Sequence, residues 1–211
     1  MSDHPIFWTF RRCPYAMRAR LALLSSGVRV EVREILLKDK PQAFLETSAS
    51  ATVPALRLGD RVLDESSEIM IWALEQNDPQ RLLDMPKDGW NLIAANDGPF
   101  KAALDHTKYA SRYPELDIEA ERQKAADFLK DLDERLKGKT WLFGERPTLA
   151  DQAILPFVRQ FANIDRAWFD AQDWVSLRDW LNRFTKGEAF AKIMIKYNTW
   201  SKSGPPIWIG G

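Results

Sequence analysis

The spacing of apolar residues changes once along this chain of 211 residues, and that change constrains the fold more than any other feature. In the first part short strand-like runs alternate with short helical ones, whereas later almost every apolar pattern has helical spacing. Residues 78–87 separate the two parts and hold Pro79 and Pro86 with little apolar periodicity, which is typical of a linker. The sequence therefore predicts an α/β domain over residues 1–77 and an all-helical domain over residues 88–211.

The first domain is expected to order its elements as βαβ, a short helix, and then ββα. Its strands are expected at residues 5–10, 28–33, 53–58 and 61–63, and its helices at 14–26, 41–47 and 67–76. A helical crossover joins parallel strands, while the Gly59-Asp60 pair suits a hairpin between antiparallel strands, so the sheet should be mixed. This is the element order of the thioredoxin fold.

The second domain is expected to consist of helices alone. They are expected at residues 90–113, 118–137, 148–162, 176–184 and 188–197, followed by an irregular tail over 201–211. Pro99 should bend the first of them, because proline removes a backbone hydrogen bond. Thr148 and Asp151 have the spacing of a capping box, so we assign this aspartate to folding and not to catalysis.

The composition argues against several classes of partner and ligand. Lysine plus arginine and aspartate plus glutamate both number 30, and this balance argues against nucleic acid or a membrane surface as the main partner. No run approaches the ~20 apolar residues that cross a bilayer, and residues 1–5 lack a signal peptide's apolar stretch, so a cytoplasmic protein is expected. One cysteine and two histidines provide neither an internal disulfide nor a Cys/His cluster, so no metal is expected.

The strongest local signal for chemistry is Cys13, which lies between the first expected strand and the first expected helix. Backbone N–H groups and the helix dipole at a helix N-terminus favour an anion, and Arg11 and Arg12 add positive potential. Both effects favour the thiolate, which is the reactive form of cysteine. A lone cysteine is usually a buried structural residue, but the position between an arginine pair and the helix-initiating Pro14 favours the functional interpretation.

Five segments, in order, resemble the omega-class glutathione transferases and their bacterial relatives. They are FWTFRRCPYAMRARL at residues 7–21, LKDKP at 37–41, TVPA at 52–55, LDES at 63–66 and FGERPTLAD at 143–151. Each segment is weak alone, but the ordered set spans both expected domains. The resemblance implies a glutathione transferase architecture, chemistry of the cysteine type at Cys13, and glutathione as the cosubstrate.

The resemblance also implies a set of glutathione-binding residues. Val53, before a cis-Pro54, would pair its backbone with the cysteinyl part of glutathione as an added strand does. Ser66 suits the γ-glutamyl carboxylate and Glu65 its ammonium, while Lys40 aligns with the lysine that reaches the glycine carboxylate. The plainer alternatives are an ordinary proline at a strand start, a serine that only caps the following helix, and solvated charges at Glu65 and Lys40.

Three further residues are weaker candidates for the pocket of the second substrate. Tyr15 lies two positions after Cys13, and His106 and Tyr109 are about one turn apart on the first long helix, which borders this pocket in the family. A lone histidine is more often structural or solvated. Ala16 occupies the place of the second cysteine of dithiol glutaredoxins, so an internal disulfide cycle is impossible.

The function expected from these residues is glutathione-dependent thiol transfer to a small electrophilic or disulfide substrate, through a mixed disulfide on Cys13. One alternative is glutathione conjugation or reductive dehalogenation, with Cys13 polarising bound glutathione. Another is a non-catalytic module of the same fold that binds other proteins. A homodimer is also expected, because relatives commonly pair and because Met70, Trp72 and Leu74 face different sides of their helix and leave apolar surface to bury.

Overall fold

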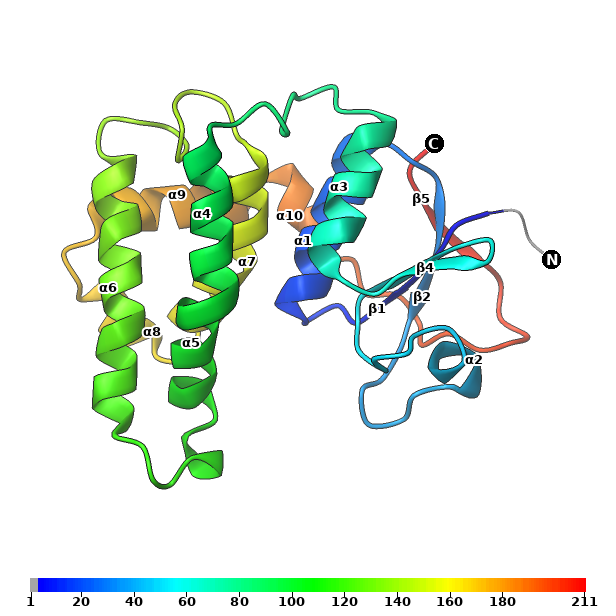
Figure 1. Ribbon diagram of the computed structural model, residues 1–211, viewed down its shortest axis with the longest axis horizontal. Coiled ribbons are helices and arrows are strands. Elements are labelled where there is room, and N and C mark those ends of the chain that lie inside the picture. The colour runs from blue at the N-terminus through cyan, green and yellow to red at the C-terminus, as the bar shows by residue number, and fades with distance from the viewer. Residues whose placement is uncertain (1–3) are drawn as a thin grey trace. The chain divides into compact units, whose positions relative to one another are not determined.

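The computed structural model describes residues 4–211 and shows two folded units (Figure 1). One unit comprises residues 4–83 together with Gly187–Gly211, and the other comprises Asp84–Lys186. The predicted domains, 1–77 and 88–211, differ from this division because the last part of the chain belongs to the first unit. Residues 1–3, on which part of the expectation about the N-terminus rests, lie outside the described residues.

The first unit has the predicted thioredoxin-like arrangement. Its elements are β1 (Ile6–Thr9), α1 (Pro14–Ser26), β2 (Val30–Glu34), α2 (Gln42–Leu45), β3 (Ala55–Leu58), β4 (Arg61–Leu63), α3 (Ser66–Gln76), α10 (Glu188–Ile193) and β5 (Ile207–Ile209). β1 pairs with β2 in parallel and with β3 antiparallel, and β3 pairs with β4 antiparallel. The sheet is therefore mixed, as predicted, and its strand order is β4-β3-β1-β2-β5.

Helix α1 begins shortly after the central strand β1 ends. β1 is buried along its whole length, because it has a strand on each side and because α1 and α3 pack together on one face of the sheet (Figure 1). Pro14 fills the first helical position, where a missing N–H costs nothing. Gly27 ends the helix at φ +69°, a left-handed conformation that glycine adopts without strain. The helix thus starts directly after Cys13, as the sequence indicated.

The C-terminal tail forms the edge strand β5, which pairs antiparallel with β2 and sets Ile207 opposite Val32. The tail is also tied to the end of β2, because the Trp200 N–H donates to the Glu34 carbonyl oxygen at 2.8 Å. Three residues between a proline pair and a glycine pair carry no periodicity of their own, so only the open edge of β2 makes them a strand. The prediction of an irregular tail within the helical domain is therefore wrong.

The second unit is helical, as predicted. Its elements are α4 (Lys87–Ala95), η1 (Asn96–Phe100), α5 (Lys101–Lys108), η2 (Ala110–Arg112), α6 (Ile118–Leu136), α7 (Leu149–Ala162), α8 (Arg166–Asp170) and α9 (Val175–Lys186). The bend expected at Pro99 is a π-helical turn, η1, which accommodates a residue without an N–H. The regular helix ends at Lys108, earlier than predicted, and the short helix α8 was not expected.

Asp151 joins three segments of the second unit. Its carboxylate accepts hydrogen bonds from the N–H and the hydroxyl of Thr148, both at 2.8 Å, in the predicted capping box. It also accepts from the Leu142 N–H at 3.0 Å and from the Trp180 indole N–H at 2.9 Å. The side chain is fully buried, and burial raises its pKa against the opposing effect of these donors. Asp151 thus organises the start of α7, away from solvent.

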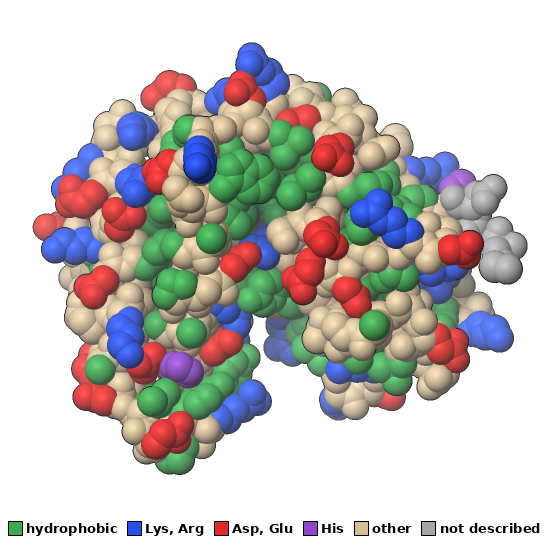
Figure 2. Space-filling view, in the orientation of Figure 1, with side chains coloured by type: hydrophobic (Ala, Val, Ile, Leu, Met, Phe, Trp, Pro, Cys, Tyr) green, Lys and Arg blue, Asp and Glu red, His purple; other side chains and the backbone are tan. Residues whose placement is uncertain are grey.

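The surface shows no single dominant sign of charge on the face seen in Figure 2. Acidic and basic side chains are interspersed there, as the equal totals in the sequence suggest. Among the helices of residues 4–211, none has both the length and the apolar character needed to span a bilayer.

Candidate active site

Cys13 occupies the N-cap position of α1, with φ −73° and ψ 124°. Its N–H donates to the Phe10 carbonyl oxygen at 3.0 Å, and its carbonyl oxygen accepts from the Met17 N–H at 2.9 Å. The residue is half-buried. The loop therefore presents the thiol at a helix N-terminus, where backbone N–H groups and the helix dipole favour the thiolate.

The thiol of Cys13 lies against the backbone of Val53. Its Sγ lies 3.6 Å from the Val53 carbonyl oxygen, to which it donates a weak hydrogen bond. The peptide bond between Val53 and Pro54 is cis, as the resemblance implied. Cys13 packs against a cluster of buried side chains that includes this valine: Ile6, Trp8, Ile35, Phe44, Val53 and Ala55. The predicted nucleophile and one predicted glutathione-binding residue are thus neighbours.

Glu65 and Ser66 begin helix α3. Glu65 takes the N-cap position without a capping hydrogen bond from its side chain, and Ser66 is the first helical residue, so the alternative of a serine N-cap is wrong. Ser66 is buried, and its hydroxyl oxygen accepts a hydrogen bond from Arg18 Nε at 3.0 Å. Glu65 is exposed. The two predicted ligand-binding side chains therefore differ in their surroundings, one in solvent and one beside a buried cation.

Lys40 stabilises the loop that precedes Val53. Its ammonium group donates to the Ala51 carbonyl oxygen at 2.9 Å. Ala51 has φ +51°, which is uncommon for a residue with a side chain. The Ser50 N–H in the same loop donates to the Asp64 carboxylate at 3.2 Å. Lys40 therefore has a partner within the fold besides the carboxylate that the resemblance assigns to it.

The two arginines before Cys13 have different environments. Arg11 donates its backbone N–H to Glu34 Oε1 at 2.6 Å and its guanidinium to the Met194 carbonyl oxygen at 3.4 Å. Arg12 is exposed, and its guanidinium lies 5.3 Å from the centroid of the Phe10 ring. Part of the positive potential expected at the thiol is therefore offset by a carboxylate.

Arg18 is the residue of this region that the sequence analysis missed. It is buried on α1, donates to the Ser66 hydroxyl oxygen and lies over the Tyr15 ring at 5.1 Å. It thus links the helix that begins at Cys13 with the start of α3. Arginine is rarely fully buried without a partner. The position of Arg18 among the apolar residues of a helix was therefore a signal that it is buried and paired.

The weaker candidates lie in different units. Tyr15 belongs to the first unit and is half-buried on α1. His106 belongs to the second unit, where its Nδ1 lies 2.7 Å from Glu121 Oε2 and its ring meets the Tyr113 ring edge to face. Tyr109 lies beside two cationic side chains at the end of α5. A role for His106 and Tyr109 at the second-substrate pocket stays a prediction.

The predicted binding residues include the polar groups that a thiol peptide with a carboxylate at each end and one ammonium group requires, and their role in binding it stays a prediction. Lys40 provides a cation, Glu65 an exposed anion, and Ser66 a hydroxyl at the start of α3. Backbone groups of Val53 lie next to the thiol. Across the part of the chain that the structure describes, no group of three or more His, Cys, Asp or Glu side chains is arranged to hold a metal ion.

The fold and the cysteine at the start of α1 define a thioredoxin-fold protein with an appended helical unit. Two family models match the chain, the glutathione S-transferase N-terminal domain over residues 7–82 and the glutathione S-transferase C-terminal domain over residues 114–183. The chain therefore belongs to the glutathione S-transferase family, and it is a glutathione transferase.

Named relatives agree with this assignment. The chain is 26% identical over 167 residues to glutathione S-transferase omega-1 of Mus musculus, covering 75% of this chain and 67% of that protein. Glutathione transferase Omega 3C from Trametes versicolor is similar in structure, with a TM-score of 0.77 at 15% identity over 92% of this chain and 85% of that one. A glutathione transferase family member from Pseudomonas fluorescens Pf-5, solved with two glutathione bound, gives a TM-score of 0.75 at 21% identity over 91% and 92%. At these identities the two solved structures show the shared fold.

Proposed function

We propose that this glutathione transferase is a thiol transferase in which Cys13 is the nucleophile. The observation that carries the proposal is the position of the single cysteine, half-buried at the N-cap of α1 with its Sγ 3.6 Å from the Val53 carbonyl oxygen. A thiolate at a helix N-terminus is a competent nucleophile for disulfide exchange. The similarity to a relative named omega-1 supports the same chemistry.

The reaction consists of two thiol–disulfide exchanges. In the first, the Cys13 thiolate attacks the glutathione sulfur of a mixed disulfide, the sulfur–sulfur bond breaks, and the substrate leaves as a thiolate that takes a proton from water. In the second, the thiolate of a free glutathione attacks the Cys13-bound sulfur and restores the Cys13 thiolate. The substrate is released as a thiol, and the glutathionyl group of its mixed disulfide together with one free glutathione ends as one glutathione disulfide.

The surrounding residues bind the glutathione that enters this cycle. Val53 pairs its backbone with the cysteinyl part, and its position beside Sγ brings the glutathione sulfur within reach of the nucleophile. Ser66 and the N-terminus of α3 accommodate the γ-glutamyl carboxylate, and Glu65 its ammonium. Lys40 binds the glycine carboxylate while it maintains the loop at Ala51.

The experiment that tests this function separates thiol transfer from conjugation. The full-length protein is assayed with glutathione and hydroxyethyl disulfide, and in parallel with glutathione and a chloro-nitrobenzene. We expect disulfide reduction to be the faster reaction, and mass spectrometry without reductant to show one glutathione bound to Cys13. Rapid conjugation with no adduct on Cys13 would instead support the alternative in which the cysteine only polarises bound glutathione.

Ser66→Ala is expected to weaken glutathione binding by about 1.5–3 kcal/mol, the range for a hydrogen bond to a charged group. The same change removes the acceptor of Arg18 Nε and should lower the free energy of unfolding by about 1–3 kcal/mol. Calorimetry with glutathione and chemical denaturation measure the two effects separately. Ser67→Ala, at the next residue of α3, is the matched control. Unchanged affinity with reduced stability would show that Ser66 only supports Arg18.

We propose that the protein is a homodimer, as is typical of the family. The apolar helix face expected from the sequence gives this little support, because Met70 and Leu74 are each only 1% exposed and only Trp72 of the three is half-buried. Symmetric pairing remains the commonest form of assembly for soluble proteins. Light scattering should give a mass near twice the 24.3 kDa of one chain. A single-chain mass at every concentration would contradict the dimer without affecting the assignment of Cys13.

A cytoplasmic location is part of the same proposal. A single cysteine that acts as a thiolate must stay reduced between turnovers, and the cytosol maintains thiols in that state through glutathione and thioredoxin.

A further inference from the structure

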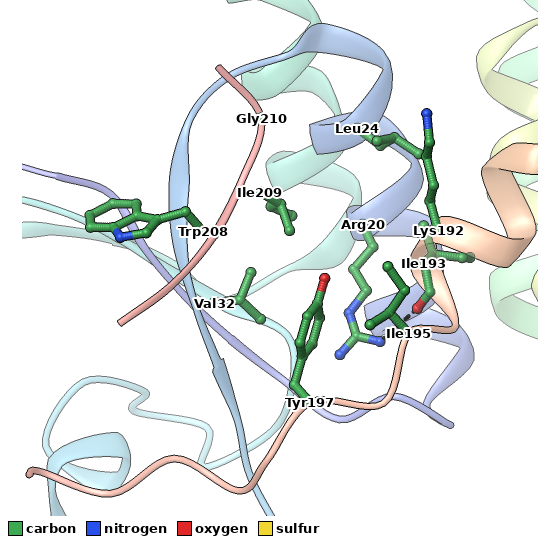
Figure 3. A pocket seen from close by; sticks show the side chains of 10 residues that line it. All are labelled: Arg20, Leu24, Val32, Lys192, Ile193, Ile195, Tyr197, Trp208, Ile209 and Gly210. Carbon is green, nitrogen blue, oxygen red and sulfur yellow. Dashed lines mark hydrogen bonds between the residues drawn. The ribbon is translucent and has the colours of Figure 1, made fainter. Parts of the chain in front are cut away.

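The first unit contains a pocket of about 280 Å³ between α1, β2, α10 and the C-terminal strand β5 (Figure 3). Its size is close to the lower end of the range of ~300–1,000 Å³ for small-molecule sites. None of the residues that line it belongs to the set assigned to glutathione. The tail that the sequence analysis expected to be irregular supplies part of its wall.

Most of the pocket wall is apolar. The apolar side chains that line it are Leu24, Val32, Ile193, Ile195, Trp208 and Ile209. They come from α1, from β2, from the end of α10 with the residues just after it, and from β5, and Figure 3 shows them around the same space. A wall of this kind favours a ligand with an apolar body, because binding removes apolar surface of both the wall and the ligand from water.

Arg20 places a buried cation in this wall. Its side chain is only 3% exposed. One terminal nitrogen donates to the Ile193 carbonyl oxygen at 3.0 Å, and the other is paired with the Glu34 carboxylate. Its Nε, however, is buried without a hydrogen-bond partner. A buried donor without a partner is unfavourable, so an acceptor that enters the pocket would remove that penalty.

The charges around Arg20 leave an excess of positive charge. Glu34 is the carboxylate that pairs with Arg20, and the same carboxylate accepts the Arg11 N–H. Burial is the main cause that lowers the pKa of Arg20, and the nearby charge of Arg11 lowers it further. Lys192 lines the pocket but pairs with Glu188 at 2.7 Å. Two arginine charges, those of Arg20 and Arg11, therefore act here against the carboxylate of Glu34, which favours an anionic ligand group.

Tyr197 provides a second polar group beside Arg20. It lines the pocket from the tail, and Figure 3 shows its ring next to the guanidinium and its hydroxyl directed into the space between α1 and β5. Burial raises the pKa of Tyr197, so the hydroxyl keeps its proton at neutral pH and is a donor. A protonated phenol and an unpaired guanidinium N–H together suit the two oxygens of a carboxylate.

We infer that this pocket binds a small carboxylate with an apolar body, at a site separate from that of glutathione. The carboxylate accepts hydrogen bonds from Arg20 Nε and the Tyr197 hydroxyl, and the apolar body lies among the aliphatic side chains and Trp208. The strand β5 forms one wall, so binding also stabilises the C-terminal tail on the sheet.

Octanoate and 1-octanol distinguish this inference from simple apolar adsorption. Titration calorimetry on the full-length protein should show octanoate binding at least about tenfold tighter than 1-octanol, because only the carboxylate satisfies both donors. The affinity for octanoate should be the same with and without saturating glutathione. Equal affinities for the two compounds, absence of octanoate binding, or displacement of octanoate by glutathione would each overturn the inference.

Two variants locate the binding in the pocket. Tyr197→Phe retains the ring and removes the hydroxyl, so octanoate affinity should fall about fivefold while 1-octanol affinity is unchanged. Ile195→Trp fills the pocket from a side chain that is 48% exposed, and should weaken both ligands by about tenfold or more. Val175→Trp, at a 55% exposed residue of the other unit, is the matched control. Wild-type octanoate affinity in Ile195→Trp would reject this pocket. Arg20 itself is left unchanged, because its loss would leave Glu34 without its partner.

Discussion

Cys13→Ala is expected to reduce thiol-transfer activity to the rate of the reaction without enzyme. The chain has no other cysteine, so no other side chain can form the mixed disulfide with glutathione. The substitution should leave the fold intact, because the residue is only half-buried and its hydrogen bond to the Val53 carbonyl oxygen is a weak thiol contact at 3.6 Å. Turnover of hydroxyethyl disulfide, measured beside glutathione affinity and thermal stability, checks this result.

Cys13→Ser is the informative companion of that variant. A hydroxyl at the N-cap of α1 cannot form a disulfide, but it can donate a hydrogen bond to the glutathione thiolate and so favour conjugation. We expect it to lose thiol transfer as completely as the alanine variant and to retain or gain conjugation of a chloro-nitrobenzene. Thiol transfer at the wild-type rate in either variant would refute the nucleophilic role of Cys13.

Asp151→Ala should produce the largest loss of stability of any single substitution described for this protein. The change removes the shared acceptor of hydrogen bonds from Leu142, Thr148 and Trp180, and leaves these donors buried. We expect the free energy of unfolding to fall by about 3–5 kcal/mol, since each buried unpaired donor is costly. Chemical denaturation monitored by far-ultraviolet circular dichroism measures the loss in the helical unit.

Trp180→Phe is the matched control for that substitution. It removes one donor and keeps an aromatic ring in place, so a smaller loss of about 1–2 kcal/mol is expected. A stability loss below ~1 kcal/mol in Asp151→Ala would contradict the structural role of Asp151.

The folded-state pKa of Asp151 is raised by burial, so the folded protein binds a proton there more tightly than the unfolded chain does. Acidification therefore should not unfold the protein through this carboxyl group.

Local patterns in the sequence were sufficient for the order of elements from β1 to α3 and for the position of Cys13. Pro14 and Gly27 bound α1 because a helix start tolerates a missing N–H and a helix end favours a left-handed residue. The capping box of Thr148 and Asp151 spans one helical turn, so the three-residue separation of the two can be recognised in the sequence. The family resemblance added the cis bond before Pro54, which no local pattern requires.

Tertiary contacts decided the surroundings of the predicted residues. Ser66 was expected from its place at the start of a helix, but its partner Arg18 comes from a different helix. Lys40 donates to a loop that adopts an unusual conformation at Ala51. Such pairings depend on which faces of distant elements meet, and the spacing of residues along one element carries no information about that.

The sequence by itself determined a mixed sheet with a cysteine at the start of its first helix, followed by a helical unit, because strands, helices and caps depend on neighbours a few residues apart. Only the tertiary structure decided that the tail returns to the sheet as β5 and encloses a pocket over Arg20. Ile207–Ile209 is too short to be stable as a strand alone, and it becomes one because β2 offers unpaired backbone groups at its edge. A backbone edge exists only after the sheet has formed, so no pattern within the tail could reveal it.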